Sequence, residues 1–307
     1  ITDLIFEGLI TLHDPLRPGV AEALQKLTDA GITTVLATGD HLGTALTVAR
    51  GVGLVASTSS TAEVIEAAEL RALTDEQLAL RVQTVRVFAR VAPLDKLRIL
   101  QAFQARGNVV AMTGDGVNDA PSIKQADIGI AMGSGTHVAR DVSDLVLLDD
   151  NYETIAAAVE EGRRIVHTIR SVVVYLFSSV LNEMMLVGGA LVLGLPLPLV
   201  ALQILWINFF SDSFPAIAFA FEKNESGVIH RRATNIFEPA LRWFALGVSF
   251  CTSLVLLAAY VLLIGRAYPL ETVQSTLFVS LGLYTLLLAF SVRSLESPQT
   301  LRMIFAN

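Results

Sequence analysis

The first 150 residues alternate short apolar runs with longer amphipathic stretches, a pattern typical of a parallel sheet covered by helices on both faces. The apolar runs predict strands at Leu4–Leu12, Thr33–Ala37, Val85–Ala89, Val109–Met112, Ile128–Ala131 and Leu145–Leu148. The amphipathic stretches predict helices at Pro18–Ala30, Thr44–Gly51, Thr61–Ala72, Asp75–Arg81, Pro93–Arg106 and Thr136–Val142. We therefore expect residues 1–150 to form an α/β domain.

The second half of the chain contains long stretches with one charged residue or none. Segments of about 20 apolar residues are long enough to cross the hydrocarbon core of a bilayer. Four such segments predict membrane helices near Ser171–Leu195, Pro198–Phe221, Trp243–Gly265 and Thr272–Val292. We expect a helical stalk over residues 151–170 and an α-helical transmembrane domain over residues 171–307.

The basic residues between these segments predict the orientation in the membrane. The loop after the second segment carries Lys223, His230, Arg231 and Arg232, whereas the loop after the third carries only Arg266. Because positively charged loops stay on the cytoplasmic side, the α/β domain should also be cytoplasmic. The sequence thus predicts a multi-pass integral membrane protein, which we place in the cell membrane.

Composition agrees with a chain that is partly embedded in lipid. Hydrophobic residues make up 53% of the 307 positions and the mean hydropathy is +0.58, which is too apolar for an ordinary soluble enzyme. The formal net charge is −7 and no basic run occurs, so we expect no nucleic-acid partner. The single cysteine, Cys251, lies in an apolar stretch and allows neither a disulfide framework nor a cysteine-rich metal site.

The run Met112–Pro121 carries two carboxylates, Asp115 and Asp119, on a glycine-rich turn directly after an apolar run. Glycines let the backbone bend sharply, and ligands of open α/β sheets bind at the carboxyl ends of the strands. Mg²⁺ is usually held by one or two carboxylates together with water and substrate phosphate. This run therefore predicts a phosphate and magnesium site.

The same run resembles the hinge motif of P-type ATPases, whose phosphorylation domain has the haloacid-dehalogenase-like (Rossmannoid) α/β fold. Leu36–His41 resembles the Thr-Gly-Asp segment of that family, and Phe88–Lys96 resembles its conserved-lysine segment. His13–Arg17 resembles the turn at which the chain re-enters the phosphorylation domain. The resemblance covers nearly the whole chain and implies a type II cation pump represented by part of its phosphorylation domain and membrane helices five to eight.

The resemblance also implies roles for individual residues. Asp115 would hold Mg²⁺ with Asp119 nearby, and Asn118 would hydrogen-bond the transferred phosphoryl group. Lys96 would supply positive charge, as phosphoryl transfer requires. The implied catalytic set is Thr38, Gly39, Lys96, Asp115, Asn118 and Asp119, and the implied ATP-binding set is Arg17, Thr38, Gly39, Asp40, Arg90, Lys96 and Asn118.

The family forms an aspartyl-phosphate at an Asp-Lys-Thr-Gly sequence, and these 307 residues contain no such sequence. We expect that segment to lie upstream, together with the nucleotide-binding and actuator domains and the first four membrane helices of the same pump. The chain alone is therefore expected to be incapable of turnover.

Two ionisable residues, Glu183 and Asp212, lie inside the first two predicted membrane helices. Such residues are costly in lipid and are functional-site hypotheses by default. Asn208 precedes Asp212 by four residues, so the two should share a helix face. With Ser211 they form a set of hard oxygen ligands suited to Ca²⁺.

The segments Ile204–Ala216 and Ser178–Glu183 resemble the sixth and fifth membrane helices of calcium pumps. Val180 stands where a two-site pump has asparagine, and Leu287 stands about where such a pump has glutamate. We therefore expect one transport site, built on Asn208 and Asp212. Glu183 would be a partial second ligand or a group for proton countertransport.

Three alternatives stay open. The first is a pump for another cation, namely H⁺, Na⁺ or Mn²⁺. The second is a non-catalytic pump-like membrane protein, suggested by the missing nucleophile. The third is a membrane-tethered phosphatase, which would not explain polar residues at mid-membrane depth.

Overall fold

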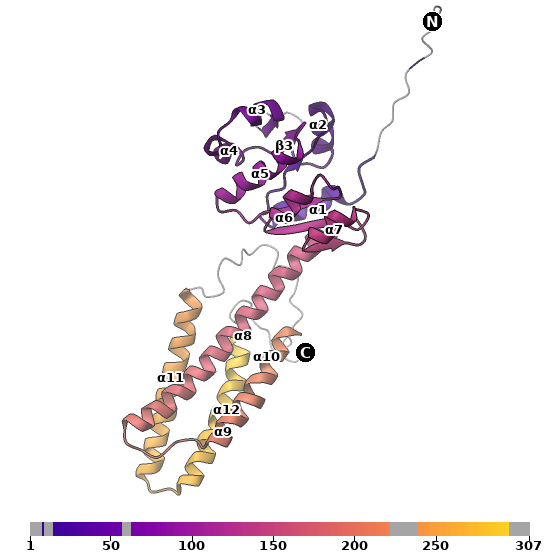
Figure 1. Cartoon of the computed structure of the whole chain (residues 1–307). Coiled ribbons are helices and arrows are strands. Elements are labelled where there is room, and N and C mark those ends of the chain that lie inside the picture. The colour runs from indigo at the N-terminus through magenta and orange to yellow at the C-terminus, as the bar shows by residue number, and fades with distance from the viewer. Residues whose placement is uncertain (1–7, 9–14, 57–62, 222–238, 295–307) are drawn as a thin grey trace, which may run out of the picture. The chain divides into compact units, whose positions relative to one another are not determined.

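The computed structural model describes residues 8, 15–56, 63–221 and 239–294. The chain divides into two compact units, Ile1–Val159 and Glu160–Asn307, which we describe separately (Figure 1). Except for Gly8, the strand predicted at Leu4–Leu12 lies outside the described residues, as do the basic residues predicted to form a loop between Lys223 and Arg232.

The first unit contains two parallel sheets of three strands each among its described residues. One has the order β1–β3–β2, formed by β1 (Leu36–Ala37), β3 (Val87–Ala89) and β2 (Val64–Glu66). The other has the order β4–β5–β6, formed by β4 (Ala111–Gly114), β5 (Ile128–Met132) and β6 (Leu145–Leu147). The sequence pattern predicted the parallel arrangement but one sheet rather than two.

Seven helices are described in this unit before the long helix that follows it. They are α1 (Val20–Asp29), α2 (Leu42–Gly51), α3 (Ala67–Ala72), α4 (Asp75–Arg81), α5 (Pro93–Ala105), α6 (Ala120–Gln125) and α7 (His137–Val142). The helix predicted over Thr61–Ala72 is wrong in its first half, because Val64 and Ile65 are β-branched and pair with β3 as strand β2.

Alternate residues of β3 explain why helices lie on both faces of the first sheet. Phe88 packs with Ile65 into a cluster that includes residues of α3, α4 and α5. Val87 and Ala89 point the other way and pack against Ala45 of α2. Because successive strand side chains face opposite sides, this short apolar strand is buried on both faces. The α/β class predicted from the sequence is confirmed.

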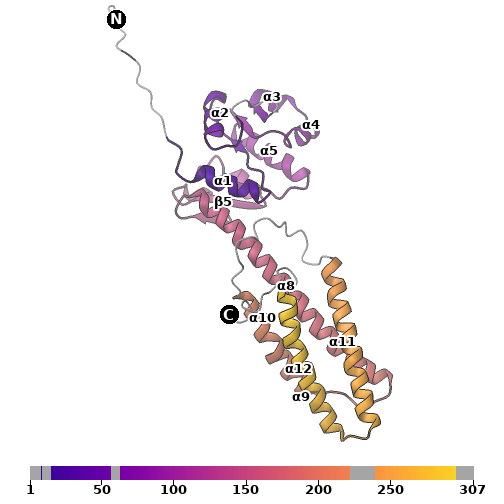
Figure 2. The same cartoon turned by 180° about the vertical axis from the view of Figure 1, so that it is seen from behind.

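The second unit is helical throughout its described part. Helix α8 (Tyr152–Val192) has 41 residues, begins before the unit boundary and continues through it. Helices α11 (Pro239–Gly265) and α12 (Leu270–Ser294) run side by side along it (Figures 1 and 2). Between α8 and α11 the chain forms α9 (Ala201–Trp206), the π-helix η2 (Ile207–Asp212) and α10 (Ser213–Ala220).

The π-helix interrupts the span predicted at Pro198–Phe221, where we expected one regular α-helix. Pro215 has no N–H to give to the carbonyl of Ser211 four residues earlier, and its ring would crowd that carbonyl. The hydroxyl of Tyr175 on α8 donates to the Ser211 carbonyl instead, at 2.8 Å. A neighbouring helix thus satisfies a backbone group that proline leaves free, as apolar surroundings require.

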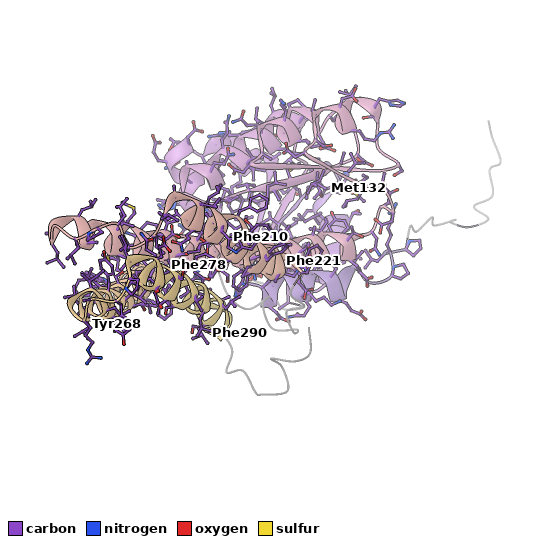
Figure 3. All side chains as sticks on the ribbon, turned by 90° about the horizontal axis from the view of Figure 1, so that it is seen from below. Met132, Phe210, Phe221, Tyr268, Phe278 and Phe290 are labelled. Carbon is purple, nitrogen blue, oxygen red and sulfur yellow. The ribbon has the colours of Figure 1, made fainter. Side chains whose placement is uncertain are left out.

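Among the described residues, three helices are long and apolar enough to cross a membrane. These are Tyr152–Val192, Leu241–Gly265 and Leu270–Val292. Large apolar side chains such as Phe210, Phe221 and Phe290 are exposed on this unit (Figure 3). Exposed apolar surface on long apolar helices is what contact with lipid requires.

Asp95 anchors the first turn of α5 in the first unit. Its carboxylate accepts a hydrogen bond from the backbone N–H of Ala92 at 2.9 Å. It also accepts hydrogen bonds from Nε and Nη2 of Arg71, at 3.1 and 2.6 Å. The side chain of Asp95 is 9% exposed, whereas that of Arg71 is 58% exposed. The Arg71 guanidinium, with the Ala92 N–H, lowers the pKa of Asp95 below its ordinary value.

We predict that Asp95→Asn lowers the thermal midpoint of the full-length protein at pH 7, because the ionised form of Asp95 is stabilised only in the folded state. This contribution is fully present above the unfolded pKa of about 4 and is lost as pH falls through the lower folded value. The difference between the two midpoints should therefore shrink as pH falls below about 4, when unfolding is followed by circular dichroism.

Asp75→Asn provides the control, since Asp75 also pairs with an arginine, Arg98, but its side chain is 85% exposed. Exposed ion pairs contribute little, so its midpoint should follow the wild type at every pH. A constant difference between Asp95→Asn and wild type down to pH 3 would contradict the prediction.

Candidate functional site

The carboxyl end of β4 carries the first group of predicted site residues. Asp115 follows the strand directly, and Asp119 lies immediately before α6. Lys96, in the first turn of α5, places its Nζ 2.7 Å from Oδ1 of Asp119. The two side chains are 18% and 11% exposed, so this ion pair is largely shielded from water. The structure therefore brings together a lysine and a carboxylate that lie 23 residues apart in the chain.

Two glycines allow close approach around these carboxylates. A Cβ on Gly114 would lie 2.5 Å from Cβ of Asp119, closer than any real contact. A Cβ on Gly135 would lie 3.0 Å from the backbone oxygen of Asp115, which also accepts the N–H of Thr136 at 2.8 Å. The turn after β4 is thus packed against Asp119, just before α6, and against the loop after β5.

The donor set at this turn fits Mg²⁺. Asp115 and Asn118 are exposed, and their side chains make no hydrogen bond within the described part of the chain. Asp119 uses Oδ1 for Lys96, and its Oδ2 lies beside Gly114 and Gly116. No cluster of three or more His, Cys, Asp or Glu that could hold a metal occurs among the described residues. Free carboxylate oxygens without a full protein cage suit Mg²⁺, which retains water and substrate ligands.

A second group lies at the carboxyl ends of β1 and β3. Thr38 accepts the N–H of Val91 through its carbonyl at 3.0 Å, and its hydroxyl accepts the N–H of Asp40 at 3.1 Å. The carbonyl of Asp40 accepts the N–H of Arg90 at 2.9 Å. Arg90 has a φ of 57°, unusual for a residue with a side chain, and its guanidinium contacts Nδ1 of His41.

These hydrogen bonds hold Thr38, Gly39, Asp40 and Arg90 in one small loop pair. Within the described residues, no hydrogen bond joins this pair to Lys96, Asp115 or Asp119. Arg17 lies elsewhere, with Nη1 donating to the backbone oxygen of Asp150 at 2.6 Å. Its role in gripping nucleotide stays a prediction, whereas its contact with the start of α8 is a structural one that the sequence did not reveal.

In the second unit, Asp212 is 3% exposed and faces α8. The hydroxyl of Ser179 lies 2.9 and 3.0 Å from its two carboxylate oxygens. Tyr175, one helical turn away, donates mainly to the Ser211 carbonyl and approaches Oδ1 of Asp212 at 3.5 Å. Neutral hydroxyl groups on α8 thus surround this buried carboxylate.

Glu183 is 7% exposed and meets Asn208 of η2. Asn208 Nδ2 donates to Glu183 Oε2 at 3.3 Å and to the carbonyl of Ile204 at 3.0 Å. Oε1 of Glu183 is buried without a hydrogen-bond partner. A buried, unpaired carboxylate oxygen is costly, so this position is of functional interest.

The remaining predicted ligand, Ser211, points elsewhere. A Cβ on Gly282 of α12 would lie 3.9 Å from its Oγ, so that hydroxyl lies beside α12. Val180 and Leu287, which replace polar residues of two-site calcium pumps, are exposed on their helices. Neither apolar side chain belongs to the buried polar cluster.

Sequence reasoning missed the neutral partners of the two carboxylates, Ser179 and Tyr175. It also missed Asn182, which is fully buried and whose Oδ1 accepts the hydroxyl of Ser253 at 2.7 Å. The available signal was the spacing along one helix: Tyr175, Ser179 and Glu183 recur every four residues, and Asn182 lies three residues after Ser179.

Comparisons with known proteins agree with both halves. The family model of haloacid dehalogenase-like hydrolases matches residues 3–127, and a second model of that description matches residues 97–159. The model described as cation transporting ATPase, C-terminus, matches residues 196–307. The first unit is therefore haloacid-dehalogenase-like, and the second resembles the C-terminal part of cation-transporting ATPases.

Curated relatives carry names of the same kind. A calcium-transporting ATPase of Bacillus subtilis is 41% identical over 298 residues, covering 95% of this chain and 33% of that protein. The probable cation-transporting ATPase F of Mycobacterium tuberculosis is 40% identical over 313 aligned positions, covering 99% of this chain and 34% of that protein. Calcium-transporting ATPase 1 of Yarrowia lipolytica is 43% identical over 229 residues, covering 74% and 25%.

The chain spans about a third of the length of the first two relatives. Family models match the domain with the lysine and aspartate pair and also the region that contains long apolar helices. With relatives at 40–43% identity over most of its length, the chain belongs to the cation-transporting P-type ATPases, a family of multi-pass integral membrane proteins.

Proposed function

We propose that the full-length protein uses ATP to move Ca²⁺ across a membrane through an aspartyl-phosphate intermediate. The observation that carries this proposal is the pair of buried carboxylates, Glu183 on the long apolar helix α8 and Asp212 on η2, which contacts α8 through Ser179. Carboxylates inside membrane helices face cavities or ion pathways. The names of the Bacillus subtilis and Yarrowia lipolytica relatives support calcium as the cargo.

The first unit supplies the groups that phosphoryl transfer needs. Catalysis of this reaction consists mainly of positioning and charge stabilisation. Lys96 would place a positive charge beside the phosphoryl group while Asp119 fixes its side chain. Asp115, with Asp119 beside it, would hold Mg²⁺, which supplies charge neutralisation at the phosphate oxygens. Asn118 and Thr38 would donate hydrogen bonds, and Arg90 and Asp40 would bind nucleotide, with Arg17 assisting.

The nucleophilic aspartate would come from a part of the protein outside these 307 residues. The same holds for the nucleotide-binding and actuator domains and for the other membrane helices. We therefore assign turnover to the full-length protein and not to this chain. The α/β unit would face the cytoplasm, with the pump in the cell membrane.

We propose one complete transport site, built on Asn208 and Asp212. Hard oxygen atoms of carboxylates, amides and backbone carbonyls are the ligands that Ca²⁺ prefers. The unpaired Oε1 of Glu183 would contribute a further ligand or a proton-exchanging group. The apolar side chains of Val180 and Leu287, where two-site pumps have polar residues, support one site rather than two. Ser211 would act through a helix rearrangement, since its hydroxyl lies beside α12.

A pump for H⁺, Na⁺ or Mn²⁺ is the main alternative. Its support is that Asp212 is surrounded by neutral hydroxyl groups rather than by cationic side chains, an environment that also suits a protonated carboxyl. A non-catalytic role is disfavoured by the intact pair of Lys96 and Asp119. The ion requirement for phosphorylation distinguishes these possibilities.

We predict that acid-stable phosphoenzyme formation from labelled ATP by the full-length protein requires Ca²⁺ on the order of micromolar. Asp212→Asn should abolish the calcium-dependent signal, because it removes the buried negative charge of the proposed site. Mn²⁺, Na⁺ and proton concentration are varied separately in the same assay. Labelling that follows another ion would reassign the cargo, and labelling under no condition would favour a non-catalytic protein.

Glu271→Gln is the matched control for the preceding experiment. Glu271 lies in the second unit and is exposed in the first turn of α12, and the removal of its charge should leave calcium dependence unchanged. Undiminished calcium-dependent labelling in Asp212→Asn would rule out the proposed transport site built on Asn208 and Asp212.

We predict that Gly114→Ala lowers phosphoenzyme formation by about 10- to 100-fold, because the new Cβ would lie 2.5 Å from Asp119 and displace it from Lys96. Gly116→Ala, two residues away, should have a much smaller effect, because its nearest neighbour would lie at 3.8 Å. Equal losses in the two variants would indicate that the turn, and not the position of Asp119, limits the reaction.

A further inference from the structure

Tyr152, the first residue of α8, contacts the strand that directly precedes Asp115. Its hydroxyl lies 3.2 Å from Oγ1 of Thr113, and either oxygen can be the donor. Thr113 lies in β4, two residues before Asp115. This hydrogen bond therefore restrains the end of β4 just before the turn that holds Asp115. None of the roles assigned above uses Tyr152 or Thr113.

A second contact from the same segment restrains the other side of Asp115. Oδ1 of Asp150 accepts the N–H of Ser134 at 3.1 Å. Ser134 belongs to the loop after β5, and in this loop Thr136 donates its N–H to the carbonyl of Asp115. Residues 150 and 152 are therefore hydrogen-bonded to both segments that hold Asp115. Asp150 itself has a φ of 52°, a conformation that tight surroundings must stabilise.

Apolar packing fixes the side from which Tyr152 approaches. Tyr152, Ile155 and Val159 of α8 pack with Leu24 and Leu27 of α1. Both views show α1 beside the first turns of α8 (Figures 1 and 2). Tyr152 is partly buried, and packing of its ring directs its hydroxyl, because a tyrosine has an apolar body and a polar tip. The hydrogen bond to Thr113 is thus built on a rigid support.

We propose that Tyr152 is a positioning residue for the magnesium site. It would act through Thr113 to hold the carboxylate of Asp115 in the orientation that binds Mg²⁺, without touching metal, nucleotide or phosphate itself. The inference rests on the proposed function in that Asp115 is taken as the magnesium ligand. Removal of one neutral hydrogen bond should weaken metal binding by about two- to tenfold.

The test compares Tyr152→Phe, which keeps the ring and its packing, with wild-type full-length protein. The Mg²⁺ concentration for half-maximal phosphoenzyme formation should rise by about two- to tenfold while the maximal level at saturating Mg²⁺ stays close to wild type. Direct binding of Mn²⁺, followed by electron paramagnetic resonance, should weaken by the same factor. The component of that signal lost in Asp115→Asn identifies the site.

Thr113→Val removes the other partner and gives an independent test if Tyr152→Phe does not fold. It should cause a similar shift, and the double variant should add little, because both changes remove one interaction. Tyr268→Phe, an exposed tyrosine between α11 and α12, should behave as wild type. Unchanged Mg²⁺ and Mn²⁺ dependence in both single variants would overturn the inference, as would a loss of maximal level without a shift in metal dependence.

The two proposals fail in different ways. Wild-type protein that forms no phosphoenzyme with any cation would contradict the proposed function, whereas Mn²⁺ binding would still decide the role of Tyr152. Wild-type protein that is active while both variants bind Mn²⁺ normally would contradict the role of Tyr152 alone.

Discussion

Burying a carboxylate costs free energy unless polar groups compensate for the lost water, and this constraint shapes both units of the protein. Asp119 is compensated by a full positive charge from Lys96. Asp212 receives only hydroxyl groups, and Glu183 receives one amide and keeps one oxygen unpaired. The first arrangement is closed and suits a fixed catalytic element. The other two are incomplete by comparison, which agrees with our proposal that they bind an exchangeable cation.

Much of the first unit could be predicted because its signals are local. Short β-branched runs gave β3 and β5 with small shifts at their ends, and glycine-rich turns followed the strands as expected. The family resemblance placed Lys96 and Asp119 in one phosphate site, and the structure adds that they form an ion pair at 2.7 Å. Strand β2 was missed because Glu63–Ala72 also has helical periodicity, and only pairing with β3 makes Val64 and Ile65 a strand.

The neutral side chains that contact Asp212 in the second unit were harder to predict from the sequence. Serine in an apolar helix usually bonds its own backbone, as Ser178 does with the carbonyl of Val174. Ser179, the next residue, instead reaches another helix. Helix propensity cannot distinguish these two serines, since the difference depends on which face of α8 contacts η2. The contacts of Tyr152 and Asp150 near Asp115 were equally hidden, because they join residues 16 to 39 positions apart in the chain.

The π-helix η2 has a consequence for the tolerance of this segment to changes in length. A π turn behaves as one extra residue inside an α-helix, and each residue of an α-helix advances the rotation by about 100°. Deleting one residue between Ile207 and Asp212 would let the segment return to regular α-helix while α10 keeps its rotation relative to α9, because the wide π turn already absorbs the extra residue. Phe219 would then keep its edge-on packing against Tyr175. Homologues with one residue fewer in this segment could therefore keep the same outer surface on α10.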